Sequence, residues 1–245
     1  MGRLYLGTSG FNYYHWQGRF YPPEIPRKAW LGFYALHFPT VELNVTFYRF
    51  PRPTTFANWC QQTPPHFLFA LKAHRSITHF KRLQGVATEV EKFFQPLVYL
   101  KDKLGLILWQ FPASFPAGEE VLAAFLELLK QHPIAQKARH AFEFRHNSWF
   151  NDRIFSLLSA YNLALCFADS PRWPQVYEVT ADFLYLRFHG SQKLYSSSYS
   201  RQELEEWAEK IKHWLEQGLD VYAYFNNDAQ GHALANAREL LTLLA

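Results

Sequence analysis

Charged and polar side chains stand at the ends of several short apolar runs in this 245-residue chain. The runs FEFRH and YLRFHG, at 142–146 and 185–190, are the clearest examples. Side chains alternate between two faces along a strand, so Glu143 and Arg145 share one face, as do Arg187 and His189. Carboxylate and imidazole groups serve as general acids and bases, and guanidinium groups bind anions. The pattern therefore predicts a polar site that is assembled where separate strands end.

Three residues at or near the strand ends are candidates for acid–base catalysis, namely Glu143, Asp169 and His189. The expected substrate-binding residues are polar or aromatic and fall at or just beyond other strand ends: Ser9, Glu42, Asn44, Lys72, Gln110, Arg145, Arg187, Asn226 and Trp16. The three cations among them suit a phosphorylated or otherwise anionic small molecule.

Ionised groups that leave water need partners. We expect Glu42 or Glu143 to pair with one of the three cations, and Asp169 to pair with His189. A structural plug, in which these charges neutralise each other without any catalytic role, is the alternative.

The residue types also allow a divalent metal, and the sequence identifies no other cofactor. The histidines and carboxylates of a type that binds metals are His74, His79, His189, Asp169 and Glu143, but no HxH or HExxH spacing occurs. We therefore assign no metal ligand. The aromatic segment GFNYYHWQGRFYPP, which follows the first strand, suggests either a stacking platform for a sugar or base or a hydrophobic lid.

Alternation of strand-like and helix-like segments predicts an α/β fold, a TIM (β/α)8 barrel forming one domain over 1–245. Strands are expected at 4–9, 41–48, 67–74, 104–110, 141–145, 164–168, 183–188 and 221–225. Helices are expected at 26–38, 53–62, 90–101, 119–131, from Asn147 or Ser148 to 160, at 201–216 and at 233–244. The stretch PRWPQVYEV makes a regular sixth helix doubtful. Active sites of this fold lie at the carboxyl ends of the strands, where the candidate residues fall.

Composition narrows the cellular setting and the range of partners. Cys60 and Cys166 are too few for a disulfide framework, and no apolar stretch is long enough to cross a bilayer. The first residues lead directly into a strand, so we expect a cytoplasmic protein with no membrane partner. The net charge is +4, and Lys and Arg predominate over Asp and Glu in residues 1–110. That imbalance suits a nucleic-acid partner or an ordinary solvated surface equally well.

Motifs along nearly the whole chain also resemble a known family. They are GTSGFNYYHWQGRFYP, VELNVTFYRFP, FLFALKAHRSITH, LGLILWQFP, FEFRHNSW, YLRFHG, and FNND with GHALANA. Together they resemble the YecE-like family, domain of unknown function 72. The resemblance implies a TIM barrel without an established activity. It also covers the candidate residues on the strands, whereas Phe11 stands where relatives often have Trp, and Asn147 where Pro is common.

Three functions follow as hypotheses. The leading one is a cytoplasmic enzyme, a hydrolase, lyase or isomerase, that acts on an anionic small molecule by acid–base chemistry. The second is nucleic-acid binding or processing by an endonuclease-like barrel, which rests on fold analogy and on the basic N-terminal part. The third is a non-catalytic scaffold that binds a partner protein. The sequence does not indicate an oligomeric state.

Overall fold

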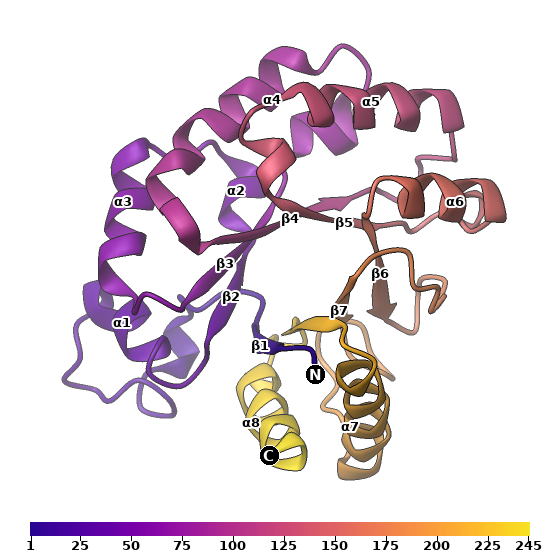
Figure 1. Ribbon diagram of the computed structural model, residues 1–245. Helices are drawn as coiled ribbons and strands as arrows, with labels where there is room; N and C mark the ends of the chain where they lie inside the picture. The colour runs from indigo at the N-terminus through magenta and orange to yellow at the C-terminus, as the bar shows by residue number, and fades with distance from the viewer. The chain divides into compact units, whose positions relative to one another are not determined.

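The computed structural model describes all 245 residues, in which strands and helices alternate along the chain (Figure 1). The strands are β1 Leu4–Thr8, β2 Thr40–Leu43, β3 Leu68–Lys72, β4 Leu104–Gln110, β5 Arg139–Glu143, β6 Ala164–Asp169, β7 Phe183–Phe188 and β8 Asp220–Phe225. The α-helices are α1 Trp30–Tyr34, α2 Val45–Tyr48, α3 Pro53–Gln62, α4 Ala87–Phe94, α5 Glu119–Gln131, α6 Asp152–Ala160, α7 Arg201–Glu216 and α8 His232–Leu244. The strand order β1-β8-β7-β6-β5-β4-β3-β2 is the connectivity of a (β/α)8 fold.

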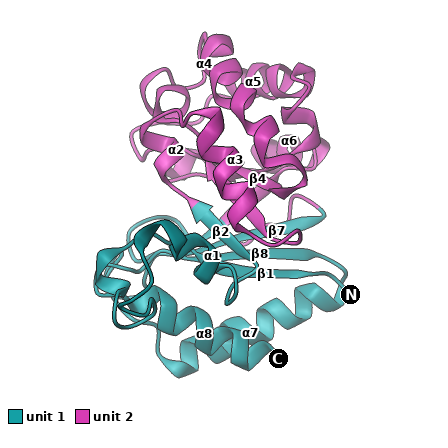
Figure 2. Cartoon of the chain, turned by 90° about the vertical axis from the view of Figure 1, so that its left-hand side faces the viewer, with its two compact units in different colours: residues 1–42, 167–175, 182–245 teal, residues 43–166, 176–181 magenta.

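The chain divides into two compact units (Figure 2). Unit 1 comprises Met1–Glu42, Phe167–Gln175 and Asp182–Ala245, and within it β8 pairs in parallel with both β1 and β7. Unit 2 comprises Leu43–Cys166 and Val176–Ala181, and within it β4 pairs in parallel with β3 and β5. The expectation of a single domain over 1–245 stays a prediction.

The second strand is shorter than the sequence pattern predicts. It ends at Leu43, and the next residues turn into the short helix α2. The Thr46 hydroxyl donates to the carbonyl oxygens of Leu43 and Lys72, at 3.0 and 2.6 Å, which holds the chain in this turn. Thr46 and Tyr48 therefore lie in a helix, contrary to the expectation of a strand over 41–48.

Other boundaries also differ from the expected ones. Strand β5 ends at Glu143, so Arg145 lies in the following loop. Helix α6 begins after Asn151, whose side chain accepts hydrogen bonds from two backbone amides of the first turn, and Asn147 instead opens a 3₁₀ turn. The expected first helix consists of a 3₁₀ turn at Arg27–Ala29 followed by α1. No helix lies between β6 and β7, which confirms the doubt about a regular sixth helix.

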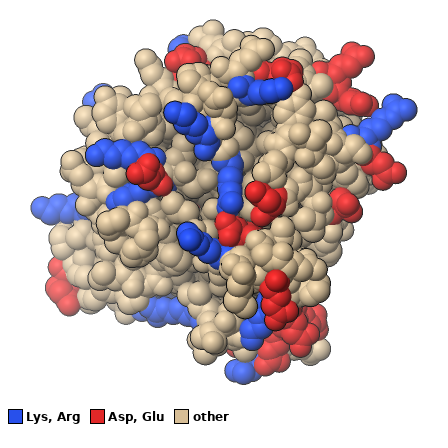
Figure 3. Space-filling model, in the orientation of Figure 1, with Lys and Arg blue, Asp and Glu red and all other residues tan.

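Aromatic side chains supply much of the core. Trp109 on β4 points toward the covering helices, with ring centroids 6.1 Å from Phe93 of α4 and 4.8 Å from Phe125 of α5. Helix α7 begins with a capping box of Ser200 and Glu203. This helix buries Trp207 and leaves its acidic side chains in solvent, where they gather at the bottom of Figure 3.

The close packing of β1 against β2 leaves no room for a side chain at Gly7. A Cβ atom at this position would lie 2.2 Å from the backbone carbonyl oxygen of Thr40, which cannot swing away as a flexible side chain would. We expect Gly7→Ala to lower the free energy of unfolding by about 1–3 kcal/mol. Gly118→Ala is the control, because its added Cβ meets only ordinary contacts at 3.6 Å. Urea denaturation measures both, and an unchanged midpoint for Gly7→Ala would contradict the packing described here.

Candidate functional site

A buried ion pair forms the polar centre of unit 1. Arg187 on β7 donates from Nε and Nη2 to the two carboxylate oxygens of Glu42 on β2, at 2.8 and 2.7 Å. Tyr185 donates its hydroxyl proton to the same carboxylate at 2.5 Å, and Ser9 donates from Oγ. All four side chains are buried. Of the pairings that the sequence left open, this is the one that Glu42 makes.

Glu42 is ionised in this setting. Burial alone would raise the pKa of its carboxyl group, but the charge of Arg187 and the hydrogen bonds from Arg187, Ser9 and Tyr185 outweigh burial and lower it. A carboxylate that accepts four hydrogen bonds has no proton to give and little freedom to move. The arrangement makes Glu42 a residue that orients Arg187.

His189 lies just beyond β7 and is fully buried. The side-chain amide of Asn226 lies 3.1 Å from its Nδ1, and Nη1 of Arg187 lies 3.5 Å from its Nε2. The rings of Trp173 and Tyr195 stand edge-on to the imidazole, with centroids 5.2 and 5.4 Å away. The imidazole is thus held in one orientation, as a positioned histidine requires.

The next residue, Gly190, has φ of +98°, and a Cβ there would lie 2.7 Å from the carbonyl oxygen of Lys193. Only glycine fits this turn without strain. The turn lets the chain leave β7 directly after the imidazole.

Asp169, at the end of β6, does not pair with His189 through its side chain. Its carboxylate accepts hydrogen bonds from Trp207 Nε1 at 3.2 Å and from Gln175 Nε2 at 3.3 Å. The backbone amide of His189 bonds instead to the Asp169 carbonyl oxygen, at 2.9 Å. Burial raises the pKa of Asp169, although hydrogen bonds from Tyr199 and Trp207 work in the opposite direction. The expected pairing is wrong because the buried indole of α7 reaches the carboxylate.

A second charged cluster lies in unit 2, at the carboxyl ends of β3 and β5. Arg145 donates from Nε to the buried Glu143 carboxylate at 2.6 Å, which is one of the expected pairings. The ammonium group of Lys72 lies 4.2 Å from the centre of the Phe47 ring, and the imidazole of His79 stands edge-on to the same ring at 4.8 Å. Lys72, Arg145 and His79 are all partly exposed to solvent.

His79 is uncharged at neutral pH. Burial lowers its pKa first, and the charges of Lys72, Arg145 and Arg75 lower it further against the opposing effect of Glu143, to about 4. Its Nδ1 lies 2.8 Å from the hydroxyl of Thr78, which orients the ring. The sequence named His79 only as a possible metal ligand. Its position beside two cations depends on a turn of π-helix at Ser76–Phe80, which no sequence pattern indicated.

The remaining predicted site residues are placed as follows. Gln110 is buried at the end of β4, and its amide donates to the carbonyl oxygen of Phe111 at 2.7 Å. Asn44 occupies the turn between β2 and α2. Trp16 is 1% exposed, and its Nε1 donates to the Asp228 carboxylate, at 3.0 Å from Oδ2. Trp16 is therefore a core residue and cannot stack on a ligand, contrary to its expected role in substrate binding.

The aromatic segment after β1 belongs mainly to the core. Tyr21 stacks on Trp30 with centroids 4.5 Å apart, and Phe20 packs edge-on against Phe33 at 5.4 Å. Trp16, Phe20 and Tyr21 are buried. The covering role expected of a hydrophobic lid suits this segment better than that of a stacking platform.

The structure contains no group of three or more His, Cys, Asp or Glu side chains arranged to hold a metal ion. None of its helices has both the length and the apolar character needed to cross a membrane.

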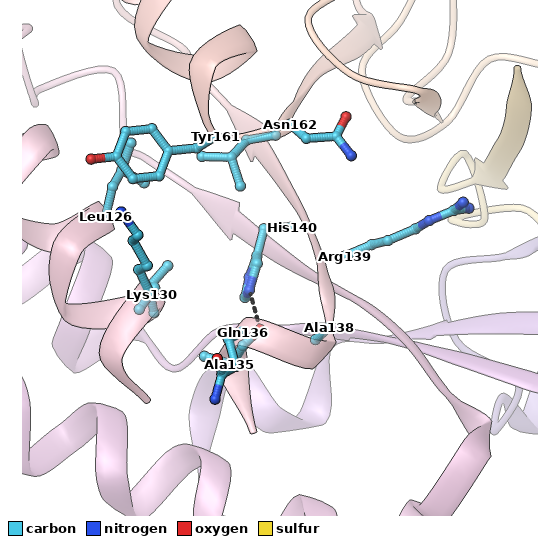
Figure 4. A pocket seen from close by; sticks show the side chains of 11 residues that line it. Leu126, Lys130, Ala135, Gln136, Ala138, Arg139, His140, Tyr161 and Asn162 are labelled. Carbon is cyan, nitrogen blue, oxygen red and sulfur yellow. Dashed lines mark hydrogen bonds between the residues drawn. The ribbon is translucent and has the colours of Figure 1, made fainter. Parts of the chain in front are cut away.

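A pocket of about 240 Å³ opens at the opposite, amino ends of β5 and β6, within unit 2 (Figure 4). His140 lies at its base, where it accepts a hydrogen bond from Trp109 Nε1 and meets the carbonyl oxygen of Ala135, both at 2.9 Å. Burial lowers the pKa of His140 to about 4. Lys130 and Tyr161 lie on one side of this histidine, and Arg139 extends away on the other. Both ring nitrogens of His140 are engaged, which indicates a structural histidine.

Comparison with known proteins agrees with the fold. The eight parallel strands with their covering helices define the class of TIM-type (β/α)8 proteins, as expected from the sequence. The crystal structure of a DUF72 family protein from Thermotoga maritima superposes with a TM-score of 0.86 at 30% identity, over 99% of each chain.

The family profile described as "Protein of unknown function DUF72" matches residues 5–245, and the chain belongs to this family. The UPF0759 protein YunF of Bacillus subtilis is 29% identical over 98% of this chain and 94% of that protein. The UPF0759 protein YecE of Escherichia coli is 32% identical over 48% of this chain and 42% of that protein.

The Glu42–Arg187 pair predicts a specific dependence of stability on pH. The pKa of Glu42 is lowered by folding, so its contribution to stability is present above the ordinary value of 4.5 and is lost as the pH falls through the folded-state pKa. We expect Glu42→Gln to lower the free energy of unfolding by about 3–5 kcal/mol at neutral pH and to flatten its decline in acid.

Tyr185→Phe is the matched control for this measurement. It removes one hydrogen bond to the same carboxylate, which costs about 1 kcal/mol, and it leaves Glu42 able to titrate. Urea denaturation at a series of pH values compares the three proteins. An equally steep acid decline in Glu42→Gln and in the wild type would contradict the assigned ionisation.

Proposed function

We propose that this protein is an enzyme that acts on a phosphorylated or otherwise anionic small molecule by acid–base chemistry. The site we assign to it is the cluster in unit 2 formed by Lys72, His79, Glu143 and Arg145. The observation that carries the proposal is the gathering of cationic side chains around a half-buried, uncharged histidine at the carboxyl ends of the strands. Active sites of (β/α)8 enzymes occur at this end of the strands.

The two cations suit the binding of an anion. The guanidinium group of Arg145 is held by Glu143 through Nε, so its outer nitrogens are directed by a fixed partner. Lys72 supplies a compact charge close to the Phe47 ring. Lys72 is the last residue of β3, and Arg145 is the second residue after β5, so the sheet limits the movement of both backbones. A bound phosphate or carboxylate would neutralise the positive charges of Lys72 and Arg145.

His79 would act as the proton-transfer group. The charges of Lys72 and Arg145 disfavour its protonated form, so it offers a lone pair to a substrate proton at neutral pH. A bound anion offsets those charges, and the pKa of His79 then rises toward its ordinary value of 6.5. The imidazole therefore becomes a better proton acceptor when substrate is present, and it can return that proton to a leaving group.

We assign positioning roles to the three residues that the sequence made candidates for acid–base catalysis. His189 is fully buried between Asn226, Arg187 and two aromatic rings. Asp169 is buried and accepts hydrogen bonds from Trp207 and Gln175. Glu143 is buried, and its carboxylate holds the guanidinium group of Arg145.

Binding of inorganic phosphate tests the proposal without knowledge of the reaction. We expect calorimetric titration to show that phosphate binds the wild-type protein and that Lys72→Met weakens binding about tenfold or more, because a charged contact to the anion is lost. Lys92→Met is the control, since Lys92 is exposed on α4 and leaves the cluster intact.

Thermal unfolding of each variant separates a binding defect from a folding defect. Equal phosphate affinity in the wild type and in folded Lys72→Met would overturn the assignment. If Lys72→Met lowered stability and changed nothing else, the charges would have the scaffold role considered from the sequence.

A further inference from the structure

Three large aromatic side chains of unit 2 stand in solvent beside the proposed anion site. Tyr48 is 63% exposed, Phe80 is 68% exposed and Phe50 is 37% exposed. Exposed aromatic rings grouped on one surface mark a binding site more often than isolated ones do. Tyr48 ends α2, which follows β2, and Phe80 ends the π-helical turn that follows β3, so both come from segments that leave the carboxyl ends of strands.

Cationic and imidazole groups accompany these rings. The guanidinium carbon of Arg75 lies 5.7 Å from the centre of the Tyr48 ring and 5.3 Å from that of Phe80. The imidazole of His74 stacks on Phe50 with centroids 4.0 Å apart. The surface therefore offers flat apolar faces with positive charge between them. This combination suits a planar, electron-rich group that is attached to an anion.

Phe47 connects this surface to the anion site. Its ring lies 4.8 Å from the ring of His79 and 4.2 Å from the ammonium group of Lys72. The neighbouring Tyr48 ring stands edge-on to it, with centroids 5.0 Å apart. Phe47 therefore contacts both the Tyr48 ring and Lys72, so a small ligand stacked on Tyr48 would be close to the anion site.

We propose that the anionic substrate is a nucleoside monophosphate, with its base stacked on Tyr48 and its phosphate held by Lys72 and Arg145. This inference rests on the proposed function, because it assigns the phosphate to the same cluster. A single ribose links base and phosphate in such a molecule, so the two groups are close together, as Tyr48 and Lys72 are through their shared neighbour Phe47. The partly exposed cations would contact the phosphate, and the exposed rings would contact the base.

Calorimetric titration with adenosine 5′-monophosphate and with ribose 5-phosphate separates the two parts of the inference. We expect the nucleotide to bind the wild-type protein at least about fivefold more tightly, because only it has a base that can stack. Tyr48→Ala should remove this advantage and leave the affinity for ribose 5-phosphate unchanged. Tyr48→Phe keeps a ring and should retain the advantage.

The control variant is Tyr161→Ala, which removes a ring of the same unit from the pocket at the amino ends of β5 and β6, at the opposite ends of the strands from this surface. Equal affinities for the two phosphates, or an undiminished advantage in Tyr48→Ala, would overturn the inference. It would also fail if an oligoadenylate bound more than about tenfold more tightly than the monophosphate, since that result would indicate a single-stranded nucleic acid.

The titrations also distinguish this failure from failure of the proposed function. If ribose 5-phosphate binds and Lys72→Met weakens that binding, the anion site stands whatever the base contributes. If ribose 5-phosphate fails to bind the wild type, or binds folded Lys72→Met equally well, the anion site itself is wrong.

Discussion

The cost of taking charge out of water shapes the polar ends of these strands. Glu42 and Arg187 are both buried. The free-energy cost of burying the two charges is offset because two hydrogen bonds join them and because Ser9 and Tyr185 donate further hydrogen bonds to the carboxylate. The same cost has a different consequence in unit 2. There His79 avoids it by remaining neutral beside Lys72 and Arg145. One constraint thus yields a fixed ion pair in one unit and a titratable histidine in the other.

Strand alternation predicted much of this arrangement from the residues alone. It predicted that Arg187 and His189 share one face of β7. It also predicted that Glu42 pairs with a cation, and the Glu42–Arg187 hydrogen bonds confirm this. It also brought Glu143 and Arg145 together, although β5 ends at Glu143 and the contact is made from the loop. Side chains two positions apart can contact each other whether both residues lie in a strand or one lies in a loop.

Strand alternation does not predict where a strand ends or which distant residues contact a side chain. Asn44 turns the chain into α2, so the predicted strand face beyond Leu43 does not exist. Asp169 bonds to Trp207, which is 38 positions away, and Trp16 bonds to Asp228, which is 212 positions away. No local pattern identifies such partners. His79 was undervalued for a related reason, because a one-turn π-helix places it beside Lys72 and Arg145.

The functional account depends most directly on the state of His79 in the free protein. Proton NMR titration of its imidazole, assigned by comparison with His79→Gln, measures that state without any ligand. The account predicts a pKa of about 4, because burial and the neighbouring cations disfavour the charged form. A pKa at or above the ordinary value of 6.5 would show that the cations do not act on this histidine and would contradict the account.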